Sequence, residues 1–505
     1  MIFGGSNQVT NRQTTNSVLI WAARSGVMVA ALAAAGAAHA SRCTDLALAF
    51  GSQLADVQCF ESTDLTTNNP ATTPANNSLA GLLPGAFTPT TDRGVIAPAA
   101  GQRTPITKAA PGLQLNARIA SDPTGEARFL LRLPDTWNGR LVVAGASGTR
   151  SEFNGDFAWS DYVVQEGYAY ASQNKGVLNL HVTSPTAATS SLDCRLNPLS
   201  TIYVQFYDNG PGQQFTRWRH YMIAAAKLAR QGVEAHYGHQ PRYTYAVGTS
   251  NGGYQVRRAI ETAPDLFDGG VDWEGTFVDA GGPNLLTDLP PAVLNFPDYV
   301  GSSYNANSTA AKNIRAAGYP PDLVIPTATG TFSLWSNYSS SFWEVTLCQW
   351  QKRLDPTYDT YRAGTGTYNY FARLSVSDVG EQLSDFATTG RIQRPLVTLA
   401  GTMDGLLPID HHARAYARKV RAHEDDDGSP PYRLYEVQNG NHIETYNQTF
   451  PQLELIEPHA QRAFDLLVQH VENGASLPPD QCIPRGGAIA DAPAQPGHCQ
   501  ALLAP

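Results

Sequence analysis

The chain has 505 residues, of which 42% are hydrophobic and 16% charged, and its formal net charge is -9 at pH 7. These proportions are ordinary for a globular protein and argue against intrinsic disorder. The acidic balance also argues against nucleic acid or an anionic membrane as the partner, so a neutral or apolar substrate fits better.

Residues 1–40 have the pattern of a secretory signal peptide. Arg12 and Arg24 precede an apolar run that leads to Ala38-His39-Ala40, a tripeptide that fits a cleavage site. Cleavage there would lower the formal charge to -11, because residues 1–40 hold two arginines and no acidic residue. No later stretch reaches the roughly 18 apolar residues of a membrane span. We therefore expect a secreted or periplasmic protein that has no membrane partner once the signal is removed.

Six cysteines follow the expected signal, and an even number in an exported chain suggests disulfide bonds. They are Cys43, Cys59, Cys194, Cys348, Cys482 and Cys499. Short loops favour pairing the first two with each other and the last two with each other, which leaves Cys194 for Cys348, although sequence alone leaves the pairings open. Zinc is less well supported because closely spaced Cys/His pairs are lacking. We expect neither a metal nor another cofactor.

Short strands are predicted along most of the chain after an N-terminal segment, 41–127. That segment includes a linker-like stretch from Glu61 to Gly81 that is rich in Thr, Asn, Pro and Ala. From residue 128 onward, apolar runs alternate with helix-like segments, which predicts an α/β fold with a mainly parallel sheet. We expect 128–274 and 392–505 to form the two parts of this core, the second with a C-terminal tail. The predicted strands are 128–133, 141–144, 168–172, 243–247, 270–273, 395–400 and 432–437.

The predicted strand 243–247 leads into Gly248-Thr249-Ser250-Asn251-Gly252, and a helix-like stretch follows. This Gly-x-Ser-x-Gly pattern is typical of a nucleophile elbow, in which the glycines leave room for an exposed serine Oγ. The pattern alone also fits an ordinary turn. The strand before it and the helix after it favour Ser250 as a nucleophile.

A serine nucleophile also needs hydrogen-bond donors for the oxyanion of its tetrahedral intermediate. The backbone N–H of Asn251, directly after Ser250, is one candidate. The turn 144–148 follows an earlier predicted strand, and we expect the N–H of Ala146 in this turn to be the second donor.

Residues 275–391 interrupt the alternation of strands and helices, and we expect them to form an inserted lid above Ser250. Trp335 and Trp343 are candidate substrate-binding residues. The alternative is that the aromatic residues of this segment form the lid's own core. The aromatic residues of this segment include Phe332, Trp335, Tyr338, Phe342, Trp343 and Trp350.

A serine nucleophile needs a histidine base and a carboxylate that orients the histidine, in the chain order acid and then histidine. Asp404 follows the predicted strand 395–400, and His442 follows 432–437, so we expect both at the carboxyl ends of strands. The competing histidines do not lie in a loop directly after a predicted strand. They are His411, His412, His423, His459, His470 and His498. Surface or capping roles are expected for His411, His412, His459 and His470, which lie in or open helix-like runs.

Several segments resemble the tannase and feruloyl esterase family of α/β-hydrolases, and the similarity extends from about Arg128 to the region of His442. They are 131–140 (LRLPDTWNGR), 235–255 (AHYGHQPRYTYAVGTSNGGYQ) and 263–269 (APDLFDG). This resemblance implies an α/β-hydrolase fold with an inserted lid and a triad of Ser250, Asp404 and His442. Residues 141–176, which include ASGTR and QNKG, are also similar to secreted 3-hydroxybutyrate oligomer hydrolases, less specifically.

The resembled family usually carries paired cysteines beside the serine and the histidine, where this chain has Thr249 and Ile443. We predict a secreted serine ester hydrolase that forms an acyl-enzyme on a small-molecule or oligomeric ester. Aromatic acyl esters are the expected substrates, and 3-hydroxybutyrate oligomers or similar aliphatic oligoesters are the alternative. A serine peptidase and a non-catalytic binding protein are less well supported, and the sequence does not predict the oligomeric state.

Overall fold

The structure is a computed structural model that describes residues 42–73, 101, 103–148, 151–177, 181–183, 194–195, 203–205, 215–328, 330–355, 358, 368–424 and 430–505. The expected signal peptide and the second part of the expected linker lie outside these residues. Among the helices described, none combines the length and the apolar character needed to cross a membrane.

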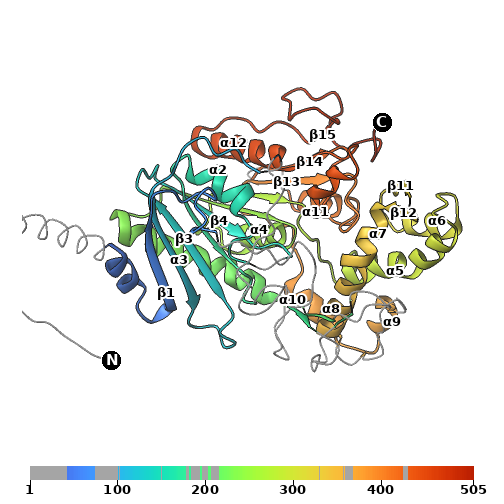
Figure 1. The fold of residues 1–505 in the computed structure, drawn as a ribbon, viewed down its shortest axis with the longest axis horizontal. Coiled ribbons are helices and arrows are strands. Elements are labelled where there is room, and N and C mark those ends of the chain that lie inside the picture. Colours follow the sequence, from blue (N-terminus) through green and yellow to red (C-terminus); the bar gives the residue numbers. More distant parts are fainter. Residues whose placement is uncertain are drawn as a thin grey trace, which may run out of the picture.

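A ten-stranded sheet forms the centre of the molecule, in the order β1-β2-β3-β5-β4-β9-β10-β13-β14-β15 (Figure 1). From β5 to β15 every neighbouring pair is parallel, whereas β1, β2 and β3 add antiparallel pairs at one edge. The mainly parallel sheet predicted from the sequence is therefore confirmed. The strands are β1 (Leu54–Ser62), β2 (Gly112–Ile119), β3 (Arg128–Pro134), β4 (Arg140–Gly145), β5 (Ala169–Gln173), β9 (Tyr243–Thr249), β10 (Gly269–Trp273), β13 (Leu396–Gly401), β14 (Tyr432–Val437) and β15 (Gln481–Ile483).

Helices cover both faces of this sheet, so its central strands are buried on both sides and read as continuous apolar runs. In β4, Leu141 and Val143 face the layer formed by α3 (Thr216–Tyr237), α4 (Asn251–Thr262) and α11 (Ala413–Arg421). Val142 and Ala144 face the opposite layer, formed by α2 (Asp161–Val164) and α12 (Glu457–Asn473). The alternation follows from the two-residue period of a strand.

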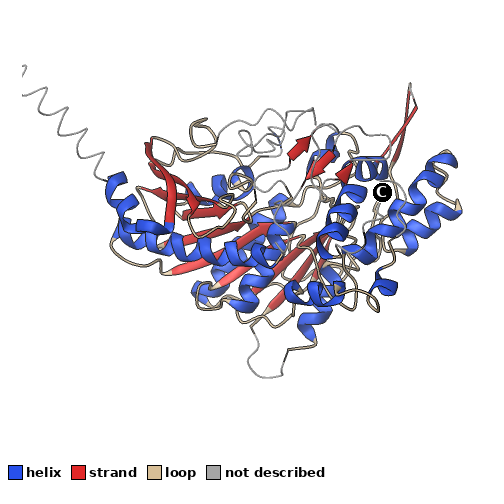
Figure 2. Ribbon diagram, turned by 90° about the horizontal axis from the view of Figure 1, so that it is seen from below, coloured by secondary structure: helices blue, strands red, loops and turns tan. Residues whose placement is uncertain are grey.

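The segment between β10 and β13 forms a separate cluster of helices beside the sheet (Figure 2). Its aromatic core is continuous with Phe215 and Trp218 on one side and with Met403 and Phe450 on the other, so it packs firmly onto the sheet domain. Its elements are α5 (Leu285–Gly301), α6 (Thr309–Ala316), β11 (Val324–Thr327), β12 (Gly330–Ser333), α7 (Leu334–Tyr338), a π-helical turn (Ser339–Trp343), α8 (Glu344–Leu354), α9 (Tyr370–Arg373) and α10 (Val379–Phe386).

Two of the three expected disulfide bonds are confirmed. Cys43 bonds to Cys59 on β1, and Cys482 on β15 bonds to Cys499 in the C-terminal tail. The side chain of Cys194 lies outside the described part of the structure, so its pairing with Cys348 stays a prediction. A small three-stranded sheet is formed by β6 (His181–Thr183), β8 (Tyr203–Gln205) and β7 (Cys194–Arg195).

Candidate active site

Ser250 lies on the sharp turn between β9 and α4. Its backbone has φ 59° and ψ -121°, a conformation that side-chain-bearing residues rarely adopt. The turn is held from both sides, because the N–H of Ser250 donates to the carbonyl oxygen of Trp273 at 2.8 Å and its own carbonyl accepts from Tyr254 at 3.1 Å. Strain of this kind persists only where the surrounding structure enforces it, and it is typical of functional sites.

Three glycines allow the chain segments at this turn to approach one another. A Cβ added to Gly252 would lie 2.6 Å from the carbonyl oxygen of Gly145, at the end of β4. A Cβ added to Gly248 would lie 2.4 Å from the carbonyl oxygen of Gly252. Any side chain at these positions would push the turn away from the sheet. The strand, turn and helix thus have the geometry of a nucleophile elbow.

Ser250, His442 and Asp404 form a continuous chain of contacts. The Nε2 atom of His442 lies 3.0 Å from the Oγ of Ser250, and its Nδ1 lies 2.7 Å from Oδ2 of Asp404. A carboxylate only accepts hydrogen bonds, so Nδ1 carries the proton and Nε2 is left to accept from the serine hydroxyl. Ser250 and His442 keep 9% and 8% of their surface exposed, whereas Asp404 keeps 2%. The serine and histidine are therefore the two members that a small molecule can reach.

The parallel pairing of β13 and β14 brings Asp404 and His442 together, because the turns that follow both strands lie at the same edge of the sheet. Asp404 is oriented by its Oδ1, which accepts from the backbone N–H groups of Leu406 and Leu407 at 2.8 and 2.7 Å. The turn that carries Asp404 is also tied to the histidine loop, since the N–H of Met403 donates to Gly440 at 2.8 Å.

A second carboxylate, which the sequence interpretation missed, lies beside His442. Glu274 directly follows β10, and its Oε2 lies 3.6 Å from Nδ1 of His442. The signal that could have revealed it is its position, because an acid after the predicted strand 270–273 would reach the same sheet edge as Asp404. Because a serine mechanism needs only one acid and Asp404 meets that need, the sequence pattern did not predict a second.

The two carboxylates change the acid–base properties of the histidine. Burial lowers the pKa of His442, but the charge of Asp404, its hydrogen bond and the charge of Glu274 outweigh burial and raise this pKa to about 9. Burial and the charge of Asp404 raise the pKa of Glu274 to about 8, against the opposing effect of His442. His442 is therefore a stronger base than an ordinary histidine.

Glu274, Asp404 and His442 also have ligand atoms close enough together to hold a metal ion. However, both ring nitrogens of His442 are already engaged, one with Asp404 and the other with Ser250. The geometry therefore fits a base between an acid and a hydroxyl better than a metal centre.

The structure corrects the expectation that Trp335 and Trp343 contact a substrate. Both side chains are completely buried, and their indole N–H groups donate to the carbonyl oxygens of Pro320 and Gly405 respectively. They are part of the core of the insertion, which was the alternative interpretation of these residues. Trp343 nevertheless supports the site indirectly, because Gly405 is the neighbour of Asp404.

A third aromatic residue of the insertion also supports the candidate site. The hydroxyl of Tyr338 donates to Oδ1 of Asn441 at 2.9 Å, and its ring leaves no room for a side chain at Gly405. The insertion thus contacts both the turn of Asp404 and the loop of His442. Tyr338 and Trp343 thus support these two loops through hydrogen bonds.

The hydrogen bonds observed argue against the N–H of Ala146 as the second oxyanion donor. The N–H of Ala146 donates to Oε1 of Gln255 at 2.9 Å, and the N–H of Ser147 donates to Asn154 at 2.7 Å. An N–H group has one hydrogen, so neither amide is available in this arrangement. The N–H of Asn251, at the first position of α4, keeps the location expected of a donor.

His412 differs from its expected surface or capping role. It is buried, its Nδ1 accepts from the N–H of Phe277 at 3.0 Å, and its Nε2 lies 3.3 Å from Asp288 on α5. His411 lies 3.0 Å from the same carboxylate. Asp288 thus joins the insertion to the sheet domain through both histidines.

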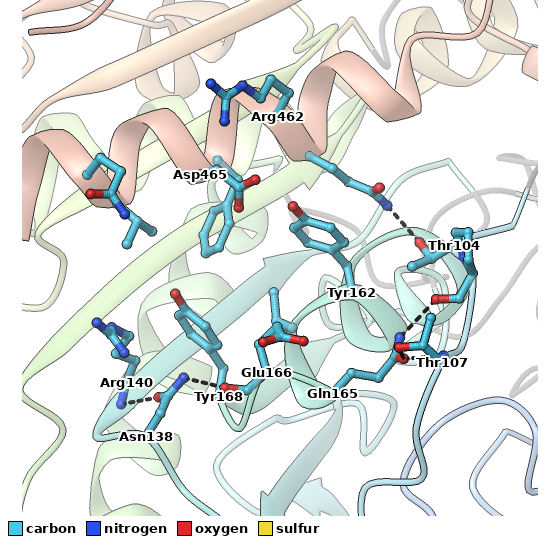
Figure 3. A pocket seen from close by; sticks show the side chains of 16 residues that line it. Thr104, Thr107, Asn138, Arg140, Tyr162, Gln165, Glu166, Tyr168, Arg462 and Asp465 are labelled. Atoms are coloured by element: carbon cyan, nitrogen blue, oxygen red, sulfur yellow. Dashed lines mark hydrogen bonds between the residues drawn. The ribbon is translucent and has the colours of Figure 1, made fainter.

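A surface groove with a volume of about 660 Å³ lies among the described residues, and Ser250 is not one of the residues that line it. Figure 3 shows the lining of this groove. Tyr162, Tyr168 and Arg140 line it together with residues of α12. Arg140 begins β4 and pairs with the first residue of β9, whereas Ser250 follows the last one. The groove therefore lies toward the amino ends of the parallel strands, whereas Ser250 lies at their carboxyl ends. It does not contribute to the candidate site.

The sheet, the strand–turn–helix at Ser250 and the loops after β13 and β14 define an α/β-hydrolase fold. Residues 356–501, which include Asp404 and His442, match the model of a family described as 3HB-oligomer hydrolase (3HBOH). The D-(-)-3-hydroxybutyrate oligomer hydrolase of Ralstonia pickettii is 34% identical over 133 residues, which cover 24% of this chain and 18% of that protein. The enzyme of the same name from Burkholderia thailandensis is 31% identical over 124 residues, which cover 23% and 17%. The matched segments thus span less than a fifth of these relatives.

Among solved structures, the feruloyl esterase B of Aspergillus oryzae is similar with a TM-score of 0.49 and 14% identity, covering 84% of this chain and 88% of that one. The tannin acyl hydrolase of Aspergillus niger has a TM-score of 0.46 and 13% identity, covering 86% and 88%.

Proposed function

We propose that the protein is a serine ester hydrolase that acts through an acyl-enzyme. The observation that carries this proposal is the contact chain from Ser250 through His442 to Asp404, located on a strained elbow of an α/β-hydrolase fold. A non-catalytic binding protein would have no need for this geometry.

In the proposed reaction, Ser250 Oγ attacks the ester carbonyl while Nε2 of His442 takes its proton. The N–H of Asn251 stabilises the oxyanion, and His442 returns the proton to the leaving alcohol. A water molecule, deprotonated by the same nitrogen, then releases the acid and regenerates Ser250. Asp404 keeps the proton on Nδ1 throughout and stabilises the imidazolium.

For the substrate, we infer 3-hydroxybutyrate oligomers or similar aliphatic oligoesters. The match of residues 356–501 and the two relatives named as D-(-)-3-hydroxybutyrate oligomer hydrolases support this choice over the aromatic acyl esters expected first. Aromatic acyl esters stay the second candidate, because the segment around Ser250 resembles tannases and feruloyl esterases.

We also propose that the protein acts outside the cytoplasm. The signal-like residues 1–40 favour export, and the bonds Cys43–Cys59 and Cys482–Cys499 are typical of an oxidising compartment.

A direct test compares the wild-type protein with Ser250→Ala on three substrates: a 3-hydroxybutyrate trimer, a p-nitrophenyl ester of a short acid, and methyl ferulate. We expect the wild type to release 3-hydroxybutyrate monomers fastest, and Ser250→Ala to lose several orders of magnitude in kcat/KM. Circular dichroism checks that the variant is folded. Near-normal turnover by a folded Ser250→Ala protein would reject the serine mechanism, and a preference for methyl ferulate would select the second substrate class.

A further inference from the structure

Glu274 is a buried acid whose position the reaction above does not explain. Its side chain is 1% exposed, and one oxygen, Oε1, accepts from the backbone N–H of Gly401 at 3.2 Å. The other, Oε2, has no hydrogen-bond partner among the described residues and points to His442, 3.6 Å from Nδ1. A buried carboxylate oxygen is costly to leave unpaired unless a nearby positive charge compensates.

The backbone around Glu274 holds this acid in place. Its φ of 53° lies in the left-handed region, and its N–H donates to the carbonyl oxygen of Leu399 on β13 at 2.7 Å. The next residue, Gly275, donates to Oδ1 of Asp272, and a Cβ at that position would lie 2.3 Å from the same oxygen. These two hydrogen bonds hold the turn, and with it Glu274, beside the histidine.

Glu274 ionises as the pH passes its raised pKa of about 8, and the positive charge that compensates the ionised form is the imidazolium of His442, 3.6 Å away. This cation forms when His442 takes the proton of Ser250 and disappears when the proton moves to the leaving alcohol. The Nδ1 proton is shared with Asp404 at 2.7 Å, so Glu274 acts on it through its charge. Two carboxylates then face one ring nitrogen, from β10 and β13.

We propose that Glu274 is a positioning residue that, together with Asp404, stabilises the protonated form of His442. This proposal rests on the proposed serine mechanism. The charged groups that act on His442 are Asp404 and Glu274, and those that act on Glu274 are Asp404, His442 and the more distant Glu444. The raised pKa of His442, to about 9, agrees with two carboxylates acting on the ring.

The test measures how fast a fluorophosphonate probe labels Ser250 as a function of pH, which needs no knowledge of the natural ester. Labelling requires neutral His442, so its rate rises as His442 loses its proton. Glu274→Gln keeps the shape of the side chain and removes its charge. We expect its labelling midpoint to fall by about one pH unit or more, as expected when an opposite charge 3.6 Å from the ring nitrogen is lost.

A matched control is Glu457→Gln, which removes a buried carboxylate on α12 that contacts Thr104. We expect this control to keep the wild-type labelling midpoint. A second variant, Glu274→Asp, restores the negative charge, and we expect its midpoint to return toward the wild-type value. An unchanged midpoint in folded Glu274→Gln would overturn the role of Glu274, because a merely structural residue would alter stability without moving the titration. The same conclusion would follow if Glu274→Asp kept the midpoint of Glu274→Gln.

A second measurement separates this proposal from the serine mechanism. The ring of His442 is titrated by NMR in isotope-labelled Ser250→Ala protein, with and without Glu274→Gln. Failure of the wild type to be labelled would reject the serine mechanism alone. A lower His442 pKa in the Glu274→Gln protein would still support the electrostatic role of Glu274, and equal values would overturn it.

Discussion

At Ser250 the unusual feature is the backbone, whereas at His442 it is the charge around the ring. The positive φ of Ser250 directs its Oγ toward His442, and two carboxylates compete with burial to determine the charge of that histidine. A serine hydrolase needs its histidine neutral at rest and charged in the transition state. The two acids therefore stabilise the charged histidine of the transition state, and they make the neutral histidine of the resting enzyme less favourable.

This balance predicts an alkaline pH profile. Because His442 must be neutral to accept the serine proton and its pKa is raised from 6.5 to about 9, activity should be low near pH 6.5 and should rise through about pH 9. The measurement is kcat/KM for a neutral ester across this range. A profile that is already level above pH 7 would show that His442 titrates as an ordinary histidine.

Trp335 provides a test of the buried role of the insertion's aromatic residues. Trp335→Ala should cost about 3 to 5 kcal/mol in the free energy of unfolding, because it empties a closed core. It should change kcat/KM for aliphatic and aromatic esters by the same factor. The control is Phe371→Ala, since Phe371 is 61% exposed and its loss should change stability by less than about 0.5 kcal/mol. Altered substrate preference at unchanged stability would instead indicate direct contact with the substrate.

At the scale of the elements, the packing of α4 against β4 and β9 leaves no room for side chains, because three glycines bring the backbones together at the elbow. The glycine spacing is local in the sequence, but the carbonyl of Gly145 that Gly252 must approach comes from a distant strand. The insertion supports the candidate site as well. Tyr338 hydrogen-bonds to the loop after β14, and Trp343 hydrogen-bonds to the loop after β13.

The elbow predicts a large difference between two Gly→Ala changes. Gly252→Ala would place a Cβ 2.6 Å from a backbone oxygen and should lower the free energy of unfolding by about 1 to 3 kcal/mol, with a loss of activity from displacement of Ser250. Gly301→Ala, at the end of α5, meets nothing within 4 Å and should be neutral. Urea unfolding and ester turnover measure both effects. Equal stability of the two variants would contradict the close approach.

At the scale of the whole molecule, the chain's last residues return to the candidate site. The side chains of Thr402, Gln438 and Asn439 donate to the carbonyl oxygens of Leu502, Ala501 and Ala504 respectively. These donors lie in the segments that lead to Asp404 and His442, and the bond Cys482–Cys499 ties this tail to β15. The other confirmed bond, Cys43–Cys59, is at the far edge of the sheet.

The two disulfides should therefore differ in their effect on catalysis. Replacing Cys43 and Cys59 with Ser should cost about 2 to 4 kcal/mol of stability and leave kcat unchanged at temperatures where the protein is folded. Replacing Cys482 and Cys499 should lower stability by a similar amount and also lower kcat, because the tail that braces both loops is released. Thermal unfolding and turnover of the two double variants provide the comparison, and equal kcat values would contradict the role of the tail.

The sequence alone determined what depends on neighbours along the chain. Apolar runs predicted the strands of the parallel sheet, and short loops predicted the bonds Cys43–Cys59 and Cys482–Cys499, because both depend on nearby residues. The chain order of nucleophile, acid and histidine, together with the strand-to-loop context, also selected Ser250, Asp404 and His442, which the structure brings into contact. Their catalytic roles stay a prediction.

Only the tertiary structure decided what depends on residues far apart in the sequence. It added β1 and β2 to the central sheet, buried Trp335 and Trp343, and engaged the N–H of Ala146 with Gln255. It also brought Glu274 beside His442. Burial, hydrogen-bond partners and electrostatic coupling depend on which residues are close in space. The parallel sheet brings such residues together because it aligns the carboxyl ends of strands that are far apart in the sequence.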